Sequence, residues 1–311
     1  MTGRMAYLMP GQGAQAVGMG RGFYDAFDEA RALYGEANAA LGFDLTALCF
    51  EGPEEELVRT DRCQLALFVT SLAAFAALRT RAPAAAAGVA GLSLGELTAL
   101  AAAEAMSIRE GLYLVQARGE AMAECAARHP GRMLAVLGLA RDVIERVARE
   151  SGAVAANFNA PEQVVLSGTD EAITKAEGLA NAAGAKRAVK LDVSGAFHSP
   201  LMQPASAALR QAVGRVRFSA PKIPVVSNVT GAVVRAGEDI PELLVAQIVS
   251  PVRWDDSIRT LIGMGADTFV EFPPAGVLSG LLRRIDRGVK GLGLNEPADL
   301  DHLAAASSTP Q

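Results

Sequence analysis

The sequence predicts an α/β protein in which a small domain interrupts a larger one, and three observations carry this prediction. Short apolar runs that suit buried strands alternate with longer helical patterns along most of the chain. Residues 132–193 follow a β-α-β-β-α-β order of their own. Strand and helix patterns then resume, so residues 1–130 and 194–311 are predicted to form one large domain around a small domain at residues 131–193.

The first part of the large domain alternates strands with helices. Ala6–Met9 is an apolar run that ends at a Pro-Gly pair, and the glycine-rich stretch 11–20 is typical of a loop that approaches a ligand closely. Ser107 and Glu110 form a capping box, so a helix starts there and runs to about Ala127. Hydrophobic periodicity predicts the remaining helices and one buried strand. The helices are Asp25–Leu41, Glu54–Leu57, Gln64–Leu78 and Gly95–Ala105, and the strand is Ala86–Leu92.

The inserted segment repeats a strand-helix-strand pattern. Its six elements are, in order, Met133–Leu137, Arg141–Glu150, Ala153–Asn157, Gln163–Ser167, Asp170–Ala183 and Arg187–Leu191. This order is the ferredoxin-like arrangement. After it, Pro200 follows Ser199 at a predicted helix start. The later elements are strands at Pro224–Asn228 and Thr268–Glu271 and a helix at Val277–Ile285.

Composition excludes several classes of protein. The 311 residues are 50% hydrophobic and only 20% charged, which rules out disorder as the main state. Lys and Arg total 29 against 34 Asp and Glu, and the net charge of −5 argues against a general binder of nucleic acid or of anionic membranes. The three cysteines have no metal-ligand spacing, so neither a disulfide framework nor a zinc site is expected.

No segment has the pattern of an export signal or a membrane span. Residues 1–10 are too short and too mixed for the apolar core of a signal peptide. The most apolar stretch, Cys63–Leu78, has 16 uncharged residues between Arg62 and Arg79, fewer than the roughly 18 to 20 that cross a bilayer. It is predicted to be a buried helix, and the whole pattern predicts a cytoplasmic protein.

Ser93 lies in a G-x-S-x-G pentapeptide, Gly91–Gly95, between the predicted strand Ala86–Leu92 and a predicted helix. This context is that of a nucleophile elbow, in which the glycines allow a tight turn and the serine Oγ projects from the end of the sheet. Backbone N–H groups at the helix start can then stabilise developing negative charge. The alternative is a tight turn with a capping serine, and the context favours the nucleophile.

A serine nucleophile needs a base, and the chain has three histidines. His302 lies in the polar C-terminal part, and His129 ends a helix before a proline. His198 falls between a strand end and a helix start, the rim at which α/β folds bind ligands. A buried, hydrogen-bonded loop histidine is the alternative for His198, but the presence of Ser93 favours the base.

Arg118 lies in an apolar row of its predicted helix, with Leu114, Met122 and Cys125 on the same stripe. It has no acidic neighbour one turn away in its own helix, and an unpaired buried cation is costly. Either a carboxylate from elsewhere in the fold or a ligand carboxylate therefore pairs with it, unless the side chain reaches solvent. Its planar guanidinium group can donate two parallel hydrogen bonds to one carboxylate.

Four ordered motifs carry a resemblance to a known family. They are Pro10-Gly11-Gln12-Gly13-Ala14-Gln15, Gly91-Leu92-Ser93-Leu94-Gly95-Glu96, Gln116-Ala117-Arg118-Gly119-Glu120 and Gly195-Ala196-Phe197-His198-Ser199. Together with Asn157–Pro161 and Pro251–Trp254, they resemble the malonyl-CoA:acyl-carrier-protein transacylases from about Ala6 to Asn295. The resemblance implies an α/β-hydrolase-like large domain with a ferredoxin-like insertion, in agreement with the pattern above.

The resemblance also implies roles for individual residues. Ser93 would be acylated, His198 would be the base and Arg118 would hold the malonyl carboxylate. The backbone N–H groups of Gln12 and Leu94 would form an oxyanion hole. A backbone carbonyl near residues 250–253, rather than an aspartate, would orient the histidine. The asparagines Asn157 and Asn159 would line the substrate cleft, with a polar β-turn as an equal alternative.

The implied reaction is ping-pong transfer of malonyl from malonyl-CoA to the phosphopantetheine thiol of an acyl carrier protein that arrives in trans, in fatty-acid or polyketide synthesis. Malonyl-CoA is then a substrate, and no cofactor, nucleic acid or membrane is expected.

The Gly-Ala-Phe-His-Ser motif resembles the malonyl-selective type. Leu92 departs from the histidine usual in the family and resembles stand-alone acyltransferases of polyketide assembly. Two rivals remain, namely a serine hydrolase that removes acyl groups from carrier proteins and a catalytically silent interaction module.

An acidic enzyme must meet an acidic carrier protein through a local basic face. Two clusters are candidates for this face. The first is Arg283, Arg284, Arg287 and Lys290, and the second is Lys186, Arg187 and Lys190. The alternative for either cluster is an ordinary solvated charged surface.

Overall fold

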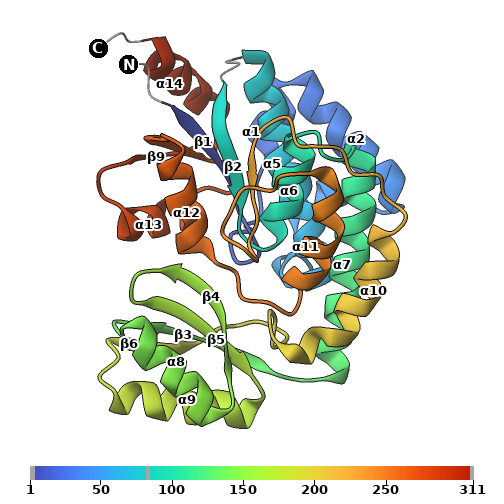
Figure 1. Ribbon diagram of the computed structural model, residues 1–311. Coiled ribbons are helices and arrows are strands. Elements are labelled where there is room, and N and C mark those ends of the chain that lie inside the picture. Colours follow the sequence, from blue (N-terminus) through green and yellow to red (C-terminus); the bar gives the residue numbers. More distant parts are fainter. Residues whose placement is uncertain (1–3, 82–84, 309–311) are drawn as a thin grey trace.

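A five-stranded parallel sheet forms the centre of the large part of the protein in the computed structural model, which describes residues 4–81 and 85–308 (Figure 1). The strands lie in the order β7-β2-β1-β8-β9, and every neighbouring pair is parallel. Their bounds are Val225–Val226 for β7, Ala86–Gly91 for β2, Met5–Met9 for β1, Thr268–Glu271 for β8 and Lys290–Gly293 for β9. Strands β1 and β2 are buried along nearly their whole length, as expected for parallel strands that helices cover on both faces.

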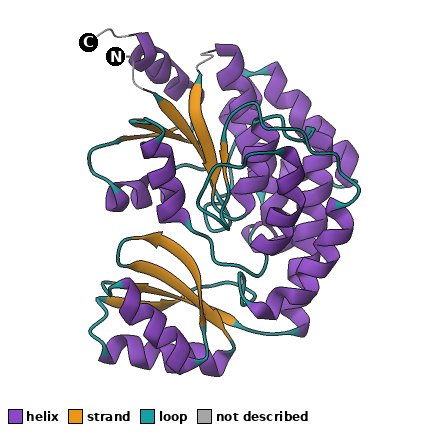
Figure 2. Cartoon of the chain, in the orientation of Figure 1, coloured by secondary structure: helices purple, strands orange, loops and turns teal. Residues whose placement is uncertain are grey.

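Helices cover this sheet on both sides, with most of them gathered on one side (Figure 2). Helix α6 (Leu94–Ala102) packs on β1 and β2, and α12 (Trp254–Gly263) and α13 (Val277–Ile285) contact strands of the same sheet. Further helices complete the layer. They are α1 (Arg21–Ala26), α2 (Asp28–Leu41), α3 (Leu45–Glu51), α4 (Glu54–Leu57), α5 (Thr60–Arg81), α7 (Ile108–Arg128), α10 (Gln203–Val213), α11 (Ile240–Gln247) and α14 (Pro297–Ser308).

Helix α5 is the apolar helix that the sequence predicts to be buried. With 22 residues it is longer than the predicted Gln64–Leu78, and by length and composition alone it could cross a membrane, so the expectation from its length was wrong. Its side chains from Cys63 to Leu78 are nevertheless almost all buried, between α2, α6 and α7. The prediction of a buried core helix is confirmed.

The inserted segment folds as the ferredoxin-like pattern predicts. Four antiparallel strands lie in the order β4-β5-β3-β6, and α8 and α9 pack on them. The elements are β3 (Arg132–Leu137), α8 (Arg141–Ser151), β4 (Val154–Ala160), β5 (Gln163–Gly168), α9 (Asp170–Ala182) and β6 (Arg187–Lys190). The segment at Val252 runs along the edge of β4, where its N–H donates to the Ala156 carbonyl at 2.8 Å and its carbonyl accepts from the Phe158 N–H at 2.9 Å. This segment of the large part of the protein thereby pairs with the small sheet next to Asn157.

One helix that the sequence predicts is divided into two helices in the structure. The sequence predicts a single helix over Asp25–Leu41, but Phe27 is extended (φ −129°, ψ 128°) and separates α1 from α2. The Phe27 N–H closes α1 on the Phe23 carbonyl, and the two rings stack with centroids 6.3 Å apart. Acidic residues in the first turn then favour a new helix start at Asp28. The capping box of Ser107 and Glu110 is confirmed at the start of α7.

Candidate active site

Ser93 occupies a strained turn between β2 and α6. Its backbone lies at φ 55° and ψ −104°, a conformation that non-glycine residues rarely adopt. A Cβ on Gly91 would lie 1.9 Å from the backbone of Gly95, and a Cβ on Gly95 would lie 2.2 Å from the Met9 carbonyl oxygen. Only glycine fits at these two positions, so the pentapeptide has the geometry of a nucleophile elbow.

Asn228 holds this turn from both sides. Its Oδ1 accepts the Ser93 backbone N–H at 2.7 Å, and its Nδ2 donates to the Gly91 carbonyl at 2.7 Å. The side chain is fully buried just beyond β7, the strand beside β2. Sequence reasoning missed Asn228, although its place at the carboxyl end of a predicted strand was a usable signal.

His198 lies against the serine. Its Nε2 is 2.8 Å from Ser93 Oγ, and its Nδ1 is 2.9 Å from the Gln247 carbonyl oxygen. Because a carbonyl only accepts, Nδ1 carries the proton and Nε2 is free to accept from the serine hydroxyl. Burial, and then the positive charge of Arg118, lower the pKa of His198 to about 4, so the imidazole is neutral at physiological pH.

The hydrogen-bonded carbonyl lies three residues before the stretch expected from the sequence. The carbonyl was predicted to lie near residues 250–253 without naming its residue, and Gln247, the last residue of α11, makes the bond. Helix ends leave carbonyls without intrahelical donors, which makes such an oxygen available to a side chain. The backbone at Ser250 contributes only in opposing the fall in the pKa of His198.

Arg118 is fully buried on α7 and points at the same serine. Its Nη2 donates to Ser93 Oγ and to Gln247 Oε1, each at 3.0 Å, and its Nη1 donates to Gln64 Oε1 at 2.6 Å. Burial lowers the pKa of the guanidinium to about 10, which leaves it protonated at neutral pH. Within residues 4–81 and 85–308 no carboxylate forms an ion pair with it, and its Nε has no hydrogen-bond partner. The alternative of a direct salt bridge inside the fold is therefore not what the structure contains.

These side chains line a cavity of about 200 Å³ between the carboxyl end of the parallel sheet and the small antiparallel sheet. The structure brings all seven sequence-predicted site residues to its wall, together with Leu92. They are Gln12, Ser93, Leu94, Arg118, Asn157, Asn159 and His198. The remainder of the wall is mainly apolar, so charges in the cavity are poorly screened.

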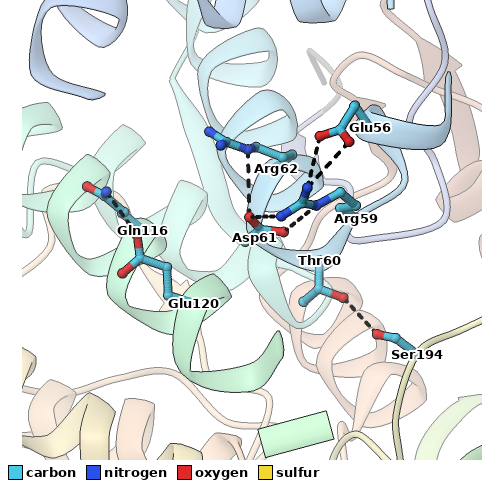
Figure 3. A network of polar contacts seen from close by, with 8 residues as sticks. All are labelled: Glu56, Arg59, Thr60, Asp61, Arg62, Gln116, Glu120 and Ser194. Atoms are coloured by element: carbon cyan, nitrogen blue, oxygen red, sulfur yellow. Dashed lines mark hydrogen bonds and ion pairs between the residues drawn. The ribbon is translucent and has the colours of Figure 1, made fainter. Parts of the chain in front are cut away.

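Gln12 and Leu94, whose backbone N–H groups were predicted to form the oxyanion hole, both belong to the cavity wall. In the described part of the chain neither of these N–H groups makes a hydrogen bond to another protein atom. The Gln12 side chain is hydrogen-bonded elsewhere, because its Nε2 donates to Thr60 Oγ1 at 3.3 Å. Thr60 Oγ1 in turn lies 3.2 Å from Ser194 Oγ. Figure 3 shows the Thr60–Ser194 contact beside a surface network of ion pairs at the start of α5. Two free donors at a loop and a helix start suit an oxyanion.

Asn157 and Asn159 belong to strand β4, so the alternative of a polar β-turn is wrong. Two residues of the cavity wall carry a buried acceptor atom without a hydrogen-bond partner in the described chain, namely Asn159 (Oδ1) and Gln163 (Oε1). Gln163, at the start of β5, was not predicted as a site residue, and nothing in its local sequence marks it. Unpaired buried acceptors are unfavourable unless a ligand supplies donors.

A parallel α/β sheet with a serine elbow facing a histidine is the architecture of a class of acyl-transferring enzymes, and the comparisons agree. Residues 6–293 match the family described as "Acyl transferase domain". The chain is 40% identical to the malonyl CoA-acyl carrier protein transacylase of Bacillus subtilis over 96% of this chain and 95% of that protein. It belongs to the malonyl-CoA:acyl-carrier-protein transacylase family.

Solved structures share the whole fold. The acyl-carrier-protein S-malonyltransferase of Burkholderia pseudomallei is 40% identical with a TM-score of 0.93, over 97% of this chain and 99% of that one. A malonyl-transacylase solved in complex with its type II polyketide synthase acyl-carrier protein is 36% identical, with a TM-score of 0.94 over 97% and 99% of the two chains. The predicted fold class, a large α/β domain with a small antiparallel insertion, is confirmed.

Proposed function

We propose that this cavity transfers a malonyl group from malonyl-CoA to the phosphopantetheine thiol of an acyl carrier protein, through an acyl-enzyme at Ser93. One observation carries the proposal. A protonated, fully buried guanidinium without an ion-pair partner in the described chain lies 3.0 Å from Ser93 Oγ. An acyl group attached to Ser93 and ending in a carboxylate would place its negative charge within reach of Arg118.

The first half-reaction loads the enzyme. His198 Nε2 accepts the hydroxyl proton as Ser93 Oγ attacks the thioester carbon, and the oxyanion is held by the N–H groups of Gln12 and Leu94. The carbon–sulfur bond then breaks, and the coenzyme A thiolate leaves with the proton that His198 returns. The Gln247 carbonyl takes the place of an aspartate, because it fixes the imidazole tautomer without adding charge.

The second half-reaction reverses these steps with a new thiol. The phosphopantetheine thiol gives its proton to His198 and attacks the malonyl ester of Ser93. The ester bond breaks, and the serine oxygen recovers the proton. The side-chain amides of Asn157, Asn159 and Gln163 belong to the cavity wall and suit the amide groups of a pantetheine arm that both thiols share.

The small domain, residues 131–193 in this proposal, supplies one wall of the cavity, and the carrier protein docks outside it. Arg283, Arg284 and Arg287 line a groove that shares Gln163, Val277 and Leu281 with the cavity wall. In the described chain none of these arginines forms an ion pair. In the second cluster, Lys186 pairs with Glu162 at 3.5 Å and Lys190 with Glu177 at 3.1 Å. We therefore favour the first cluster as the face for an acidic carrier.

The proposed setting is the cytoplasm. Cys49, Cys63 and Cys125 are all free and buried, which suits a reducing compartment. Both fatty-acid and polyketide carriers fit the same chemistry.

A loading and transfer experiment tests the function. The protein is incubated with malonyl-CoA or acetyl-CoA, the mass added at Ser93 is measured, and holo acyl carrier protein is then added. Preferential malonyl loading followed by transfer to the carrier is the expected result. Rapid release of malonate to water would support the hydrolase instead. Absence of any adduct at Ser93 would support the silent interaction module, against which the 2.8 Å contact between Ser93 and His198 argues.

A further inference from the structure

Glu96 is a buried carboxylate that the proposed mechanism does not use. It lies in the first turn of α6, three residues after Ser93, and only 2% of the residue is exposed. Burial raises its pKa to about 7, against the hydrogen bonds that it accepts from the Gln247 side chain, the Asn228 backbone and the Ser227 hydroxyl. A carboxylate in such a place is unfavourable unless it is paired.

The Gln247 side chain connects Glu96 to the reactive pair. Its Nε2 donates to Glu96 Oε2 at 2.5 Å and to the Ser93 carbonyl at 3.0 Å, while its Oε1 accepts from Arg118 Nη2 at 3.0 Å. A guanidinium only donates and a carboxylate only accepts, so the amide has one orientation that satisfies both. Glu96 and Arg118 thus lie one amide apart.

We propose that Glu96 is a positioning residue for Arg118, acting through the Gln247 amide so that the guanidinium is held and its charge balanced without a carboxylate placed directly on it. The inference rests on the proposed function. A carboxylate placed directly on the guanidinium would occupy the donors that the substrate needs. The amide between them supplies an acceptor and keeps the carboxylate off those donors.

Removal of the carboxylate should loosen this arrangement. In Glu96→Gln the side chain keeps its size, but it no longer requires the amide of Gln247 to face it with its N–H₂ group. A rotated amide turns N–H groups toward Arg118 and leaves a buried donor unpaired, which lowers the preference for malonyl-CoA over acetyl-CoA by about 10- to 100-fold. The loss falls mainly on KM for malonyl-CoA, and loading from acetyl-CoA changes much less.

A second variant tests whether Glu96 acts through Gln247. Gln247→Met removes the amide but keeps the backbone carbonyl that orients His198. If the effect travels through the amide, the double variant Glu96→Gln/Gln247→Met loses no more malonyl preference than Gln247→Met alone. Additive losses in the double variant would overturn the proposal, because they would show that Glu96 acts independently of the amide.

A matched control separates positioning from general destabilisation. Tyr34→Phe removes a buried hydrogen bond to Thr70 (2.8 Å) far from the cavity, and its melting temperature is compared with that of Glu96→Gln. The control should keep the wild-type malonyl preference.

A higher malonyl preference in Glu96→Gln would overturn the proposal, since Glu96 would then act as a charge that repels the substrate. Failure of the wild-type protein to load malonyl would instead refute the proposed function itself.

Discussion

Asn228 Oδ1 accepts the backbone N–H of Ser93 at 2.7 Å. With its Nδ2 on the Gly91 carbonyl, the same amide spans the turn on which Ser93 stands at φ 55°. A residue in this region of backbone conformation costs on the order of 1–3 kcal/mol and persists only where its surroundings hold it. The position of the proposed nucleophile therefore depends on a side chain 135 residues away in the sequence.

Asn228→Ala should slow acylation of Ser93 by about 10- to 100-fold, because the turn loses both hydrogen bonds and relaxes. Single-turnover loading from malonyl-CoA, followed by mass spectrometry, measures this rate. Asn38→Ala is the matched control, since Asn38 likewise makes two hydrogen bonds to the backbone, accepting from the N–H groups of Leu45 and Thr46, and does not line the cavity. Equal acylation rates in the two variants, at equal loss of melting temperature, would contradict the role of Asn228.

Arg118→Ala should remove most of the malonyl preference. Loss of a buried, charge-assisted contact corresponds to about 2–5 kcal/mol, so kcat/KM for malonyl-CoA should fall about 100-fold or more. Loading from acetyl-CoA, which has no carboxylate, should change by less than about tenfold. Arg118→Lys keeps the charge without the planar fork and should give an intermediate value. An unchanged preference in the alanine variant, measured by competition between the two thioesters, would refute the clamp.

The sequence predicted the residues that local patterns mark. Ser93 stands in a pentapeptide between a strand and a helix, and Arg118 is a cation in an apolar stripe, so short-range rules locate both. Asn228, Gln247 and Glu96 meet only because β7, α11 and α6 converge on one turn. No spacing rule relates positions separated by 135 or 154 residues, so this buried polar network could not be predicted.

The predicted fold was correct where local sequence determines the structure and wrong where contacts between distant residues determine it. The ferredoxin-like insertion was correct because its strands are short runs rich in apolar residues that local sequence separates from the helices. The break at Phe27 was missed because the helical pattern continues across it, whereas Phe27 is extended and its side chain packs against the hydrophobic core. The carbonyl on His198 was predicted only as lying near residues 250–253, because the end of α11 fixes it at Gln247 and this helix was not predicted.

The pH dependence of acylation should reflect the lowered pKa of His198. A base acts only when neutral, and burial beside Arg118 brings its pKa to about 4, below the usual 6.5. Acylation by acetyl-CoA should therefore stay constant from pH 7 to about pH 5 and fall to half near pH 4. The Glu96→Gln variant should keep this acid limb, because the pKa of Glu96 is about 7 and its removal leaves His198 as the group that sets the limb near pH 4. A limb centred near pH 6.5 in both proteins would contradict the buried, neutral base.

Charge reversal distinguishes the two basic clusters. The first test changes Arg283, Arg284 and Arg287 to Glu, and the comparison changes Lys186, Arg187 and Lys190 to Glu. The donor is a malonyl thioester of N-acetylcysteamine, which carries no phosphate, so that only carrier docking depends on the arginines.

The first variant should raise KM for the holo carrier protein at least about tenfold and lose most of the salt dependence of transfer, because screened charge attraction sets the encounter rate. The lysine variant should differ from wild type by less than about twofold, since its lysines already pair with Glu162 and Glu177. An unchanged transfer rate and salt dependence in both variants would show that the carrier docks elsewhere.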